Sequence, residues 1–154
     1  MHLTEVTSGR RLVLALEPGD EVLTAIAAAC RERGVAQAAI VVLSGALRSA
    51  RLIATHEPID DPEAPLADEI EVRYTEGIGS GTVSSDDAGQ YTVHVHVALG
   101  EKADGARATA GHLLHAVTHY VVEVVLDEIL TPRLTRRASE ATHGIPALSF
   151  EDAR

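Results

Sequence analysis

The sequence predicts one α+β domain built on a largely antiparallel sheet, with one main helix and a short second helix. Apolar and polar residues alternate in several segments, most regularly over residues 91–99, and this period is typical of half-buried strands. Only residues 20–33 show a clear helical spacing of apolar side chains. The chain has 154 residues, of which 45% are hydrophobic, so we expect a single domain with a substantial core.

The composition disfavours several classes of protein. A net charge of −10 argues against a large nucleic-acid-binding surface, which requires clustered Lys and Arg. The single cysteine, Cys30, cannot form an internal disulfide. Residues 1–10 lack the apolar stretch of a signal peptide, and no apolar run has the length of a membrane span. We therefore expect a soluble, cytoplasmic protein without membrane partners.

The N-terminal part of the chain predicts a strand followed by the main helix. Three leucines share one face of residues 11–16, which favours a strand. Asp20 is the expected N-cap of a helix over residues 20–33, and Gly34 suits the position just after its last turn. Cys30 falls on the apolar side of this helix, so we expect it to be buried.

The middle of the chain predicts three strands and a long loop. Residues 37–43 form a continuous apolar run that is typical of a strand buried on both faces. A second strand is expected over residues 47–55, after a short interruption. Residues 56–68 are rich in proline and acidic side chains and predict an exposed loop. Residues 69–74 alternate again, with inward positions at Ile70, Val72 and Tyr74.

A cluster of glycines follows this third strand. Gly77, Gly79 and Gly81 could form a phosphate-cradling loop, but no Lys-Ser/Thr pair or following helix supports that interpretation. A strand with a bulge or a close approach of two backbones is the favoured interpretation. A turn over residues 86–89 then predicts a hairpin into the strand at residues 91–99.

The C-terminal part contains the expected second helix. Residues 100–105 predict an exposed turn, residues 111–119 a short helix or an irregular crossing, and residues 120–129 a strand. Residues 131–154 are polar and predict an appendage or tail outside the domain, which we place at residues 7–130.

Three histidines form a candidate metal site. His94 and His96 alternate with valines, so their side chains point to one side of the strand, roughly 7 Å apart. His112 follows after a turn-rich stretch. Neutral imidazoles suit Zn²⁺, Ni²⁺ or Cu²⁺, and three of them leave a coordination position open to water or substrate. The competing interpretation is that the pair are partly exposed sheet residues and that His112 is unrelated.

Two further sets of residues allow a functional and a structural interpretation. If residues 111–119 are helical, His112, His115 and His119 share one face, although the favoured view leaves the last two facing solvent. Glu123, inside an apolar strand, could support the metal site or act as an acid or base. A glutamate at a sheet edge or a subunit contact is the favoured interpretation.

The only basic cluster consists of Arg133, Arg136 and Arg137. It could contact nucleic acid, but acidic residues follow it and the chain contains no Arg-Gly-Arg-Pro AT-hook. A solvated tail is the favoured interpretation.

A series of short motifs resembles the plants-and-prokaryotes-conserved (PPC) domain family, whose function is unknown. Their order and spacing over residues 7–130 carry the resemblance. Ala110 stands where the family usually has a second glycine before the histidine. The motifs are LEPGDEV at 16–22, RERGV at 31–35, SGALRSARL at 44–52, GIGSGTVS at 77–84, HVHVAL at 94–99, AGHLL at 110–114 and VVEVVLDEI at 121–129.

This resemblance implies a fold and an assembly. The implied fold is α+β and similar to acetolactate decarboxylase, a metal lyase with an H-x-H plus His site. The family implies a homotrimer with the histidine cluster near the subunit contacts, and a divalent metal, with zinc expected, on His94, His96 and His112. Plant members are attached to AT-hook DNA-binding motifs.

Three classes of function therefore compete. The first is a metal-dependent enzyme acting on a small molecule, and the sequence does not decide whether the protein is an enzyme. The second is a DNA-associated regulatory protein, which the plant relatives imply and the charge disfavours. The third is a non-catalytic oligomer that binds a small ligand.

Overall fold

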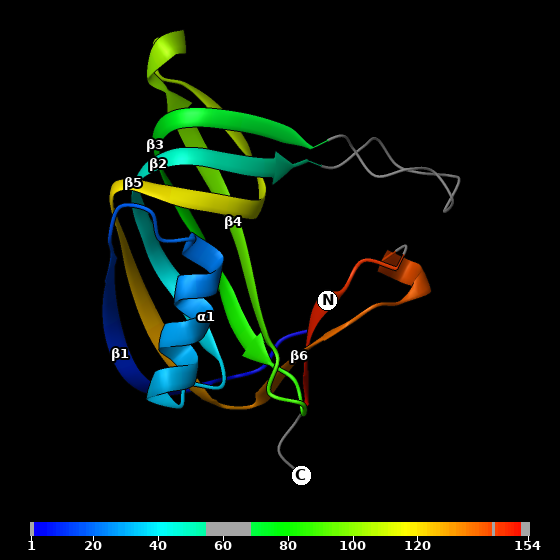
Figure 1. Ribbon diagram of the computed structural model, residues 1–154. Helices are drawn as coiled ribbons and strands as arrows, with labels where there is room; N and C mark the ends of the chain where they lie inside the picture. The colour runs from blue at the N-terminus through cyan, green and yellow to red at the C-terminus, as the bar shows by residue number, and fades with distance from the viewer. Residues whose placement is uncertain (1, 55–68, 143, 152–154) are drawn as a thin grey trace.

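The computed structural model describes residues 2–54, 69–142 and 144–151, and it contains one α-helix, a large sheet and a small one (Figure 1). The loop predicted over residues 56–68 lies outside the described residues. The elements in chain order are β1 (Thr7–Leu16), α1 (Val22–Arg33), β2 (Ala38–Ile53), β3 (Ile70–Ser85), β4 (Tyr91–Glu101), the 3₁₀ turn η1 (Lys102–Asp104), β5 (Arg107–Thr131), β6 (Arg133–Arg137), the 3₁₀ turn η2 (Glu140–Thr142) and β7 (Ala147–Glu151).

The large sheet has five antiparallel strands in the order β1-β5-β2-β3-β4. The N-terminal part of β5 also pairs with β4, so β2, β3, β4 and β5 form a closed ring of paired strands. The C-terminal part of β5 lies instead between β1 and β2. The predicted fold class, a mostly antiparallel α+β domain with one main helix, is therefore confirmed.

One face of the sheet is covered by helix α1, and the other face carries two of the candidate histidines. On β4, Val95 and Val97 are buried in the core, while His94 and His96 point to the other face. Helix α1 lies along the core face (Figure 1) and buries Val22, Ile26 and Cys30 there. We call the opposite face, which carries the two β4 histidines, the histidine face.

The ends of α1 follow local sequence signals, with one correction. Gly34 adopts the left-handed conformation expected after the last turn, at φ 65°. The N-cap, however, is Glu21 and not Asp20. The Glu21 carboxylate accepts hydrogen bonds from the Leu23 and Thr24 N–H groups, while Asp20 accepts from the Glu17 N–H and closes the preceding turn.

The short helix predicted over residues 111–119 does not exist, because this segment belongs to the 25-residue strand β5. Most of the segment pairs with β2, and its other side pairs with β4 at Gly111 and His112 and with residues 19–21 at Val117 and Thr118. Backbone hydrogen bonds to these distant segments leave no advantage to a helix, whatever the spacing of the histidines. Short helical turns do occur in the described chain, as the 3₁₀ turns η1 and η2.

The predictions for β2 and β3 need smaller corrections. The runs at 37–43 and 47–55 form one strand, β2, which passes through Gly45 without ending. A Cβ at Gly45 would lie 2.2 Å from the Val121 carbonyl oxygen, so the glycine permits close contact with β5. In β3 the alternation breaks at Tyr74, where φ is +52°, so Tyr74 is exposed and Thr75 is buried instead. Ile70 is also exposed rather than inward.

The glycines of β3 allow it to lie very close to β4. A Cβ on Gly77 or Gly81 would stand 2.1 or 1.9 Å from a β4 carbonyl oxygen. Gly79 faces the Val97 side chain in the same way. This arrangement confirms the interpretation as a close backbone approach in a strand.

The C-terminal residues form a separate hairpin, β6–β7, which the core domain anchors at its start. The buried Gln37 amide donates to the Pro132 carbonyl at 2.6 Å and accepts from the Leu134 N–H at 2.7 Å. Leu134 is itself buried. In the part of the chain that the structure describes, no helix is both long and apolar enough to cross a bilayer.

We predict that Gly81→Ala destabilises the protein by about 1–3 kcal/mol or more, the usual range for overpacking in a closely packed interior. The added methyl group would overlap the His94 carbonyl oxygen, a backbone atom that cannot move away without disturbing the β3–β4 pairing. Urea titration measures the change. Ser80→Ala, at the exposed neighbouring position, is the matched control and should stay within about 0.5 kcal/mol of wild type. Equal stability of the two variants would contradict the close approach.

Candidate metal centre

Strand β4 presents the first two histidines. His94 and His96 are two residues apart in a regular strand, so both side chains lie on the histidine face. Their ring centroids are 5.1 Å apart. His94 is partly buried and His96 is exposed, so the pair opens towards solvent on one side. This placement is the one that the alternation predicts.

Strand β5 brings His112 opposite this pair. In the register of β4 and β5, His112 is the direct partner of His96, and on its other side it pairs with Ile53 of β2. Side chains of directly paired residues lie on the same face, close enough to touch. Gly111 allows this crowding, because a Cβ there would be 2.7 Å from the Ile53 carbonyl oxygen.

An irregularity in β5 separates His112 from the residues that follow. Between Leu113 and His115, β5 advances two residues while β2 advances one, so Leu114 is the extra residue of a bulge. The Ala116 N–H beyond it donates to the Glu21 carboxylate, the N-cap of α1. Burial alone would raise the pKa of Glu21, but hydrogen bonds from the Thr24 side chain and from backbone N–H groups outweigh it and lower the pKa, so Glu21 holds the bulge as a carboxylate.

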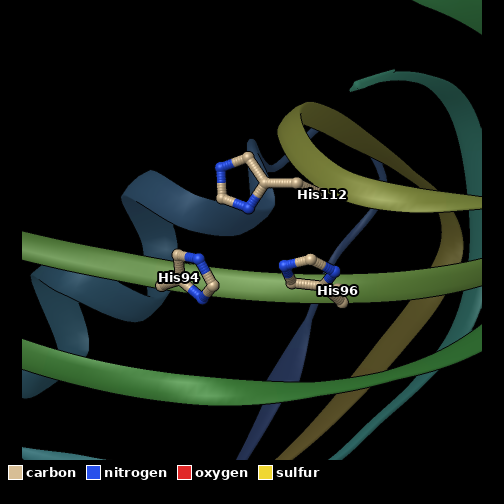
Figure 2. A group of neighbouring side chains, drawn as sticks. All are labelled: His94, His96 and His112. Atoms are coloured by element: carbon tan, nitrogen blue, oxygen red, sulfur yellow. The ribbon is translucent and has the colours of Figure 1, made fainter. Parts of the chain in front are cut away.

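The three imidazoles converge (Figure 2). One nitrogen from each of His94, His96 and His112 lies within 4.8 Å of the others, and the His94 and His112 ring centroids are 4.6 Å apart. Three nitrogens around a tetrahedral zinc lie about 3.3 Å apart when each Zn–N bond is about 2.0 Å. Small side-chain rotations would therefore bring the cluster to ligand distance. The residues that the sequence selected are those that the fold brings together.

The cluster holds its imidazoles in the form that binds metals. Burial, the nearby Arg136 charge and the other two histidines lower the pKa of His94 to about 4. Burial, His96 and Arg136 also lower the pKa of His112. Both side chains are therefore neutral at pH 7 and offer a free lone pair.

One polar atom of the cluster has no protein partner. His112 Nδ1 is buried and forms no hydrogen bond within residues 2–54, 69–142 and 144–151. A buried nitrogen without a partner costs free energy, which a bound cation would offset. The three imidazoles and this unpartnered atom fit a divalent metal ion of the zinc type, and they would leave its remaining coordination position to a ligand.

The structure does not bring the other candidate residues into the cluster. His115 contacts the Glu21 carboxylate at 3.4 Å, and His119 packs between the Tyr74 and Tyr120 rings. The helical face that would align His112, His115 and His119 does not form, because the segment is a strand with a bulge. Glu123 is exposed on the histidine face, but β2 and β3 lie between it and β4, so it does not reach the cluster.

One residue beside the cluster was interpreted wrongly from the sequence. Arg136 of β6 is half-buried and donates to the Thr82 hydroxyl at 2.8 Å, so it is not part of a solvated tail. Thr82 pairs directly with His94 across β3 and β4, which places the guanidinium on the histidine face. The basic cluster was visible in the sequence, but nothing local distinguished Arg136 from its neighbours.

Comparisons with known proteins agree with this geometry. A family model described as the Plants and Prokaryotes Conserved (PCC) domain matches residues 3–130. No protein with a curated description matches the chain.

Several solved structures are similar to this chain over most of its length. A plant- and prokaryote-conserved (PPC) protein from Pyrococcus horikoshii is 24% identical, with a TM-score of 0.79, over 100% of this chain and 99% of its own. A metal-containing protein from Archaeoglobus fulgidus is 27% identical, with a TM-score of 0.79, over 96% and 98%. A candidate DNA-binding protein from Bacteroides thetaiotaomicron is 23% identical, with a TM-score of 0.75, over 94% and 97%.

A more distant structure confirms the predicted architecture. A Staphylococcus aureus protein of unknown function, similar to alpha-acetolactate decarboxylase, has a TM-score of 0.54 and 15% identity. It covers 81% of this chain, which spans 54% of the other protein. At this identity the likeness concerns the fold and not the activity.

We predict that the metal-free protein loses stability as the pH falls from about 6.5 to about 4. The unfolded chain takes up a proton at an ordinary histidine pKa of about 6.5, whereas the folded protein takes it up on His94 only near a pKa of about 4. Acid therefore favours the unfolded state throughout this interval. Urea titrations of chelator-treated protein at several pH values measure the effect.

The control separates this site from general acid effects. His94→Gln should flatten the pH dependence over the interval, while His2→Gln, at an exposed position, should leave it unchanged. A wild-type stability that stays level or rises on acidification would contradict the proposed protonation state of the cluster.

Proposed function

The chain belongs to the Plants and Prokaryotes Conserved (PCC, also PPC) domain family, and we propose from this premise that it binds one divalent metal ion through His94, His96 and His112. The observation that carries the proposal is the convergence of three imidazole nitrogens within 4.8 Å from two strands. The metal-containing relative from Archaeoglobus fulgidus supports it.

Zinc is the ion that we propose. Imidazole nitrogens suit Zn²⁺, and zinc sites with three protein ligands and one open position are those that act on a bound molecule. When bound, such an ion would supply a Lewis acid that polarises an oxygen of its ligand. The chain's own residues hold the site: the β4–β5 register fixes the imidazoles, and burial keeps His94 and His112 neutral.

We propose a small molecule as the partner of this site, because the cluster opens to solvent at His96 rather than lying sealed in the core. The same residues are compatible with an enzyme and with a non-catalytic binding protein.

DNA binding is the weaker candidate function. The net charge is −10, and many arginines already pair with carboxylates, namely Arg10, Arg11, Arg33, Arg51, Arg73, Arg107 and Arg133.

We further propose that three copies of the chain assemble through the histidine face. This face carries large apolar side chains that nothing in the described chain covers, among them Val13, Val42 and Ile78, which are 76%, 40% and 66% exposed. Register places them with the histidines: Ile78 pairs with Ala98, two residues beyond His96. An exposed apolar face of this kind is typical of a subunit interface. The stoichiometry of three subunits follows from the family resemblance.

We predict that substitution of any cluster histidine abolishes stoichiometric metal binding. His94→Ala, His96→Ala and His112→Ala each remove one of three ligands, and affinity should fall by at least about tenfold, because even outer-sphere partners contribute about 10–100-fold. Elemental analysis of untagged protein, followed by zinc titration against a competing chelator, measures the loss.

The matched control is His115→Ala, three residues from His112 on the same strand but in contact with Glu21 instead. It should retain one metal ion per chain. Retention in all four variants, or loss only in the control, would refute the assignment.

We predict that Ile78→Glu disrupts the assembly, because the free energy needed to bury a carboxylate exceeds the free energy that the apolar contact contributes. Light scattering at micromolar concentration should give a trimer for the wild type and a smaller species for the variant. Leu3→Glu, at a still more exposed apolar position outside the sheet, should remain trimeric. A wild-type protein that is a monodisperse monomer would end the proposal.

A further inference from the structure

Arg136 stands out because its charge is half-buried and no carboxylate in the described part of the chain pairs with it. No Asp or Glu in the described chain lies within ion-pair distance of its guanidinium, whereas the neighbouring Arg133 pairs with Asp87 at 2.6 Å. Burial lowers the pKa of Arg136 from its usual value, so the environment disfavours the cation it holds. A partly desolvated, uncompensated cation is costly unless a bound anion offsets it.

The donors of Arg136 are only partly used. One terminal nitrogen donates to the Thr82 hydroxyl at 2.8 Å and the other to the Pro146 carbonyl at 3.3 Å. The Nε–H is buried and has no partner in residues 2–54, 69–142 and 144–151. A guanidinium carries five N–H donors, so capacity remains for an oxyanion.

The position of Arg136 links these donors to the histidine cluster. Its hydrogen-bond partner Thr82 is the cross-strand neighbour of His94. Its charge acts on both His94 and His112 and lowers their pKa values. An imidazole side chain carries no negative charge, so the three histidines cannot compensate the Arg136 charge.

We propose that Arg136 selects a small oxyanion, a carboxylate or phosphate group, as the ligand of the three-histidine site. This inference rests on the proposed metal site and adds the chemical class of its ligand. The guanidinium compensates the anion's charge beside the cluster and provides directed N–H donors. Neutral and cationic molecules of the same size are rejected, because they leave the Arg136 charge unpaired.

The selecting residue lies outside the family domain. The family model ends at residue 130, and Arg136 arrives on the β6–β7 hairpin, which Gln37 anchors through two hydrogen bonds. The hairpin therefore brings the proposed anion-selecting side chain to the histidine site.

The test uses the full untagged chain loaded with Co²⁺, whose visible absorption reports on its coordination. Metal content is measured first. Acetate, inorganic phosphate and neutral acetamide are then titrated in turn against wild type, Arg136→Gln, Arg136→Lys and Arg133→Gln. The last variant is the matched control, with the same change of charge on the same hairpin. Thermal unfolding of each variant confirms that it is folded.

The expected result is that acetate, phosphate or both perturb the wild-type spectrum and that acetamide does not. Arg136→Gln should weaken anion binding at least about tenfold, since hydrogen bonds to charged groups contribute about 1.5–3 kcal/mol. Arg136→Lys should retain part of the affinity and Arg133→Gln all of it. The anion that binds identifies the group as carboxylate or phosphate.

The outcomes separate the two proposals. Absence of cobalt from the wild type defeats the metal site. Anion binding is then read from the shift in melting temperature of the metal-free protein, and a shift lost only in Arg136→Gln still supports the arginine. Bound cobalt with equal anion affinity in wild type and Arg136→Gln, or no response to either anion, overturns the role of Arg136 and leaves the metal site standing.

Discussion

The pairing of β5 with two strands at once is the constraint on which the rest of the structure depends. At His112, β5 lies between β4 and β2, and each backbone N–H and C=O has a neighbour to bond. This double pairing closes the ring of strands and fixes the register His96 opposite His112. A slip of one residue would turn His112 into the core and a core side chain out. The same strand pairing therefore determines both the stability of the fold and the geometry of the site. The bulge at Leu114 and the hydrogen bond from Ala116 to the Glu21 carboxylate maintain this pairing.

The two faces of the sheet divide stability from function. The core face buries a continuous apolar cluster beneath α1, and the glycines of β3 tighten it by letting β3 approach β4. The histidine face carries groups that cost free energy in the isolated chain: neutral, partly buried imidazoles, an unpartnered nitrogen and exposed valine and isoleucine. Such costs are typical of sites whose ligands and partners offset them. The proposed metal ion, anion and further copies of the chain would each offset a different one of these costs.

The C-terminal hairpin extends this division. Residues beyond 130 add little to the core except Leu134, but they carry a cation to the side of an uncharged cluster. Gln37 makes this possible, because its buried amide can satisfy a carbonyl and an N–H of the departing chain together. The proposed choice of ligand therefore depends on residues that lie beyond the matched family domain.

Local sequence determined the features that depend on neighbouring residues. The alternation of residues 91–99 placed His94 and His96 on one face, Gly34 ended the helix, and the spacing of α1 buried Cys30. His112 was a candidate from its place after a turn-rich stretch, and the family motifs include it. Only the tertiary structure decided that residues 111–119 form a strand, because most of their pairing partners lie on β2, far away in the chain. The same is true of Arg136, whose sequence neighbours suggest a solvated tail, since its burial depends on Thr82 and on a hairpin anchored at Gln37. Contacts between distant segments leave no local pattern in the sequence. For that reason the sequence could predict the three histidines of the site but not the position of Arg136 beside them.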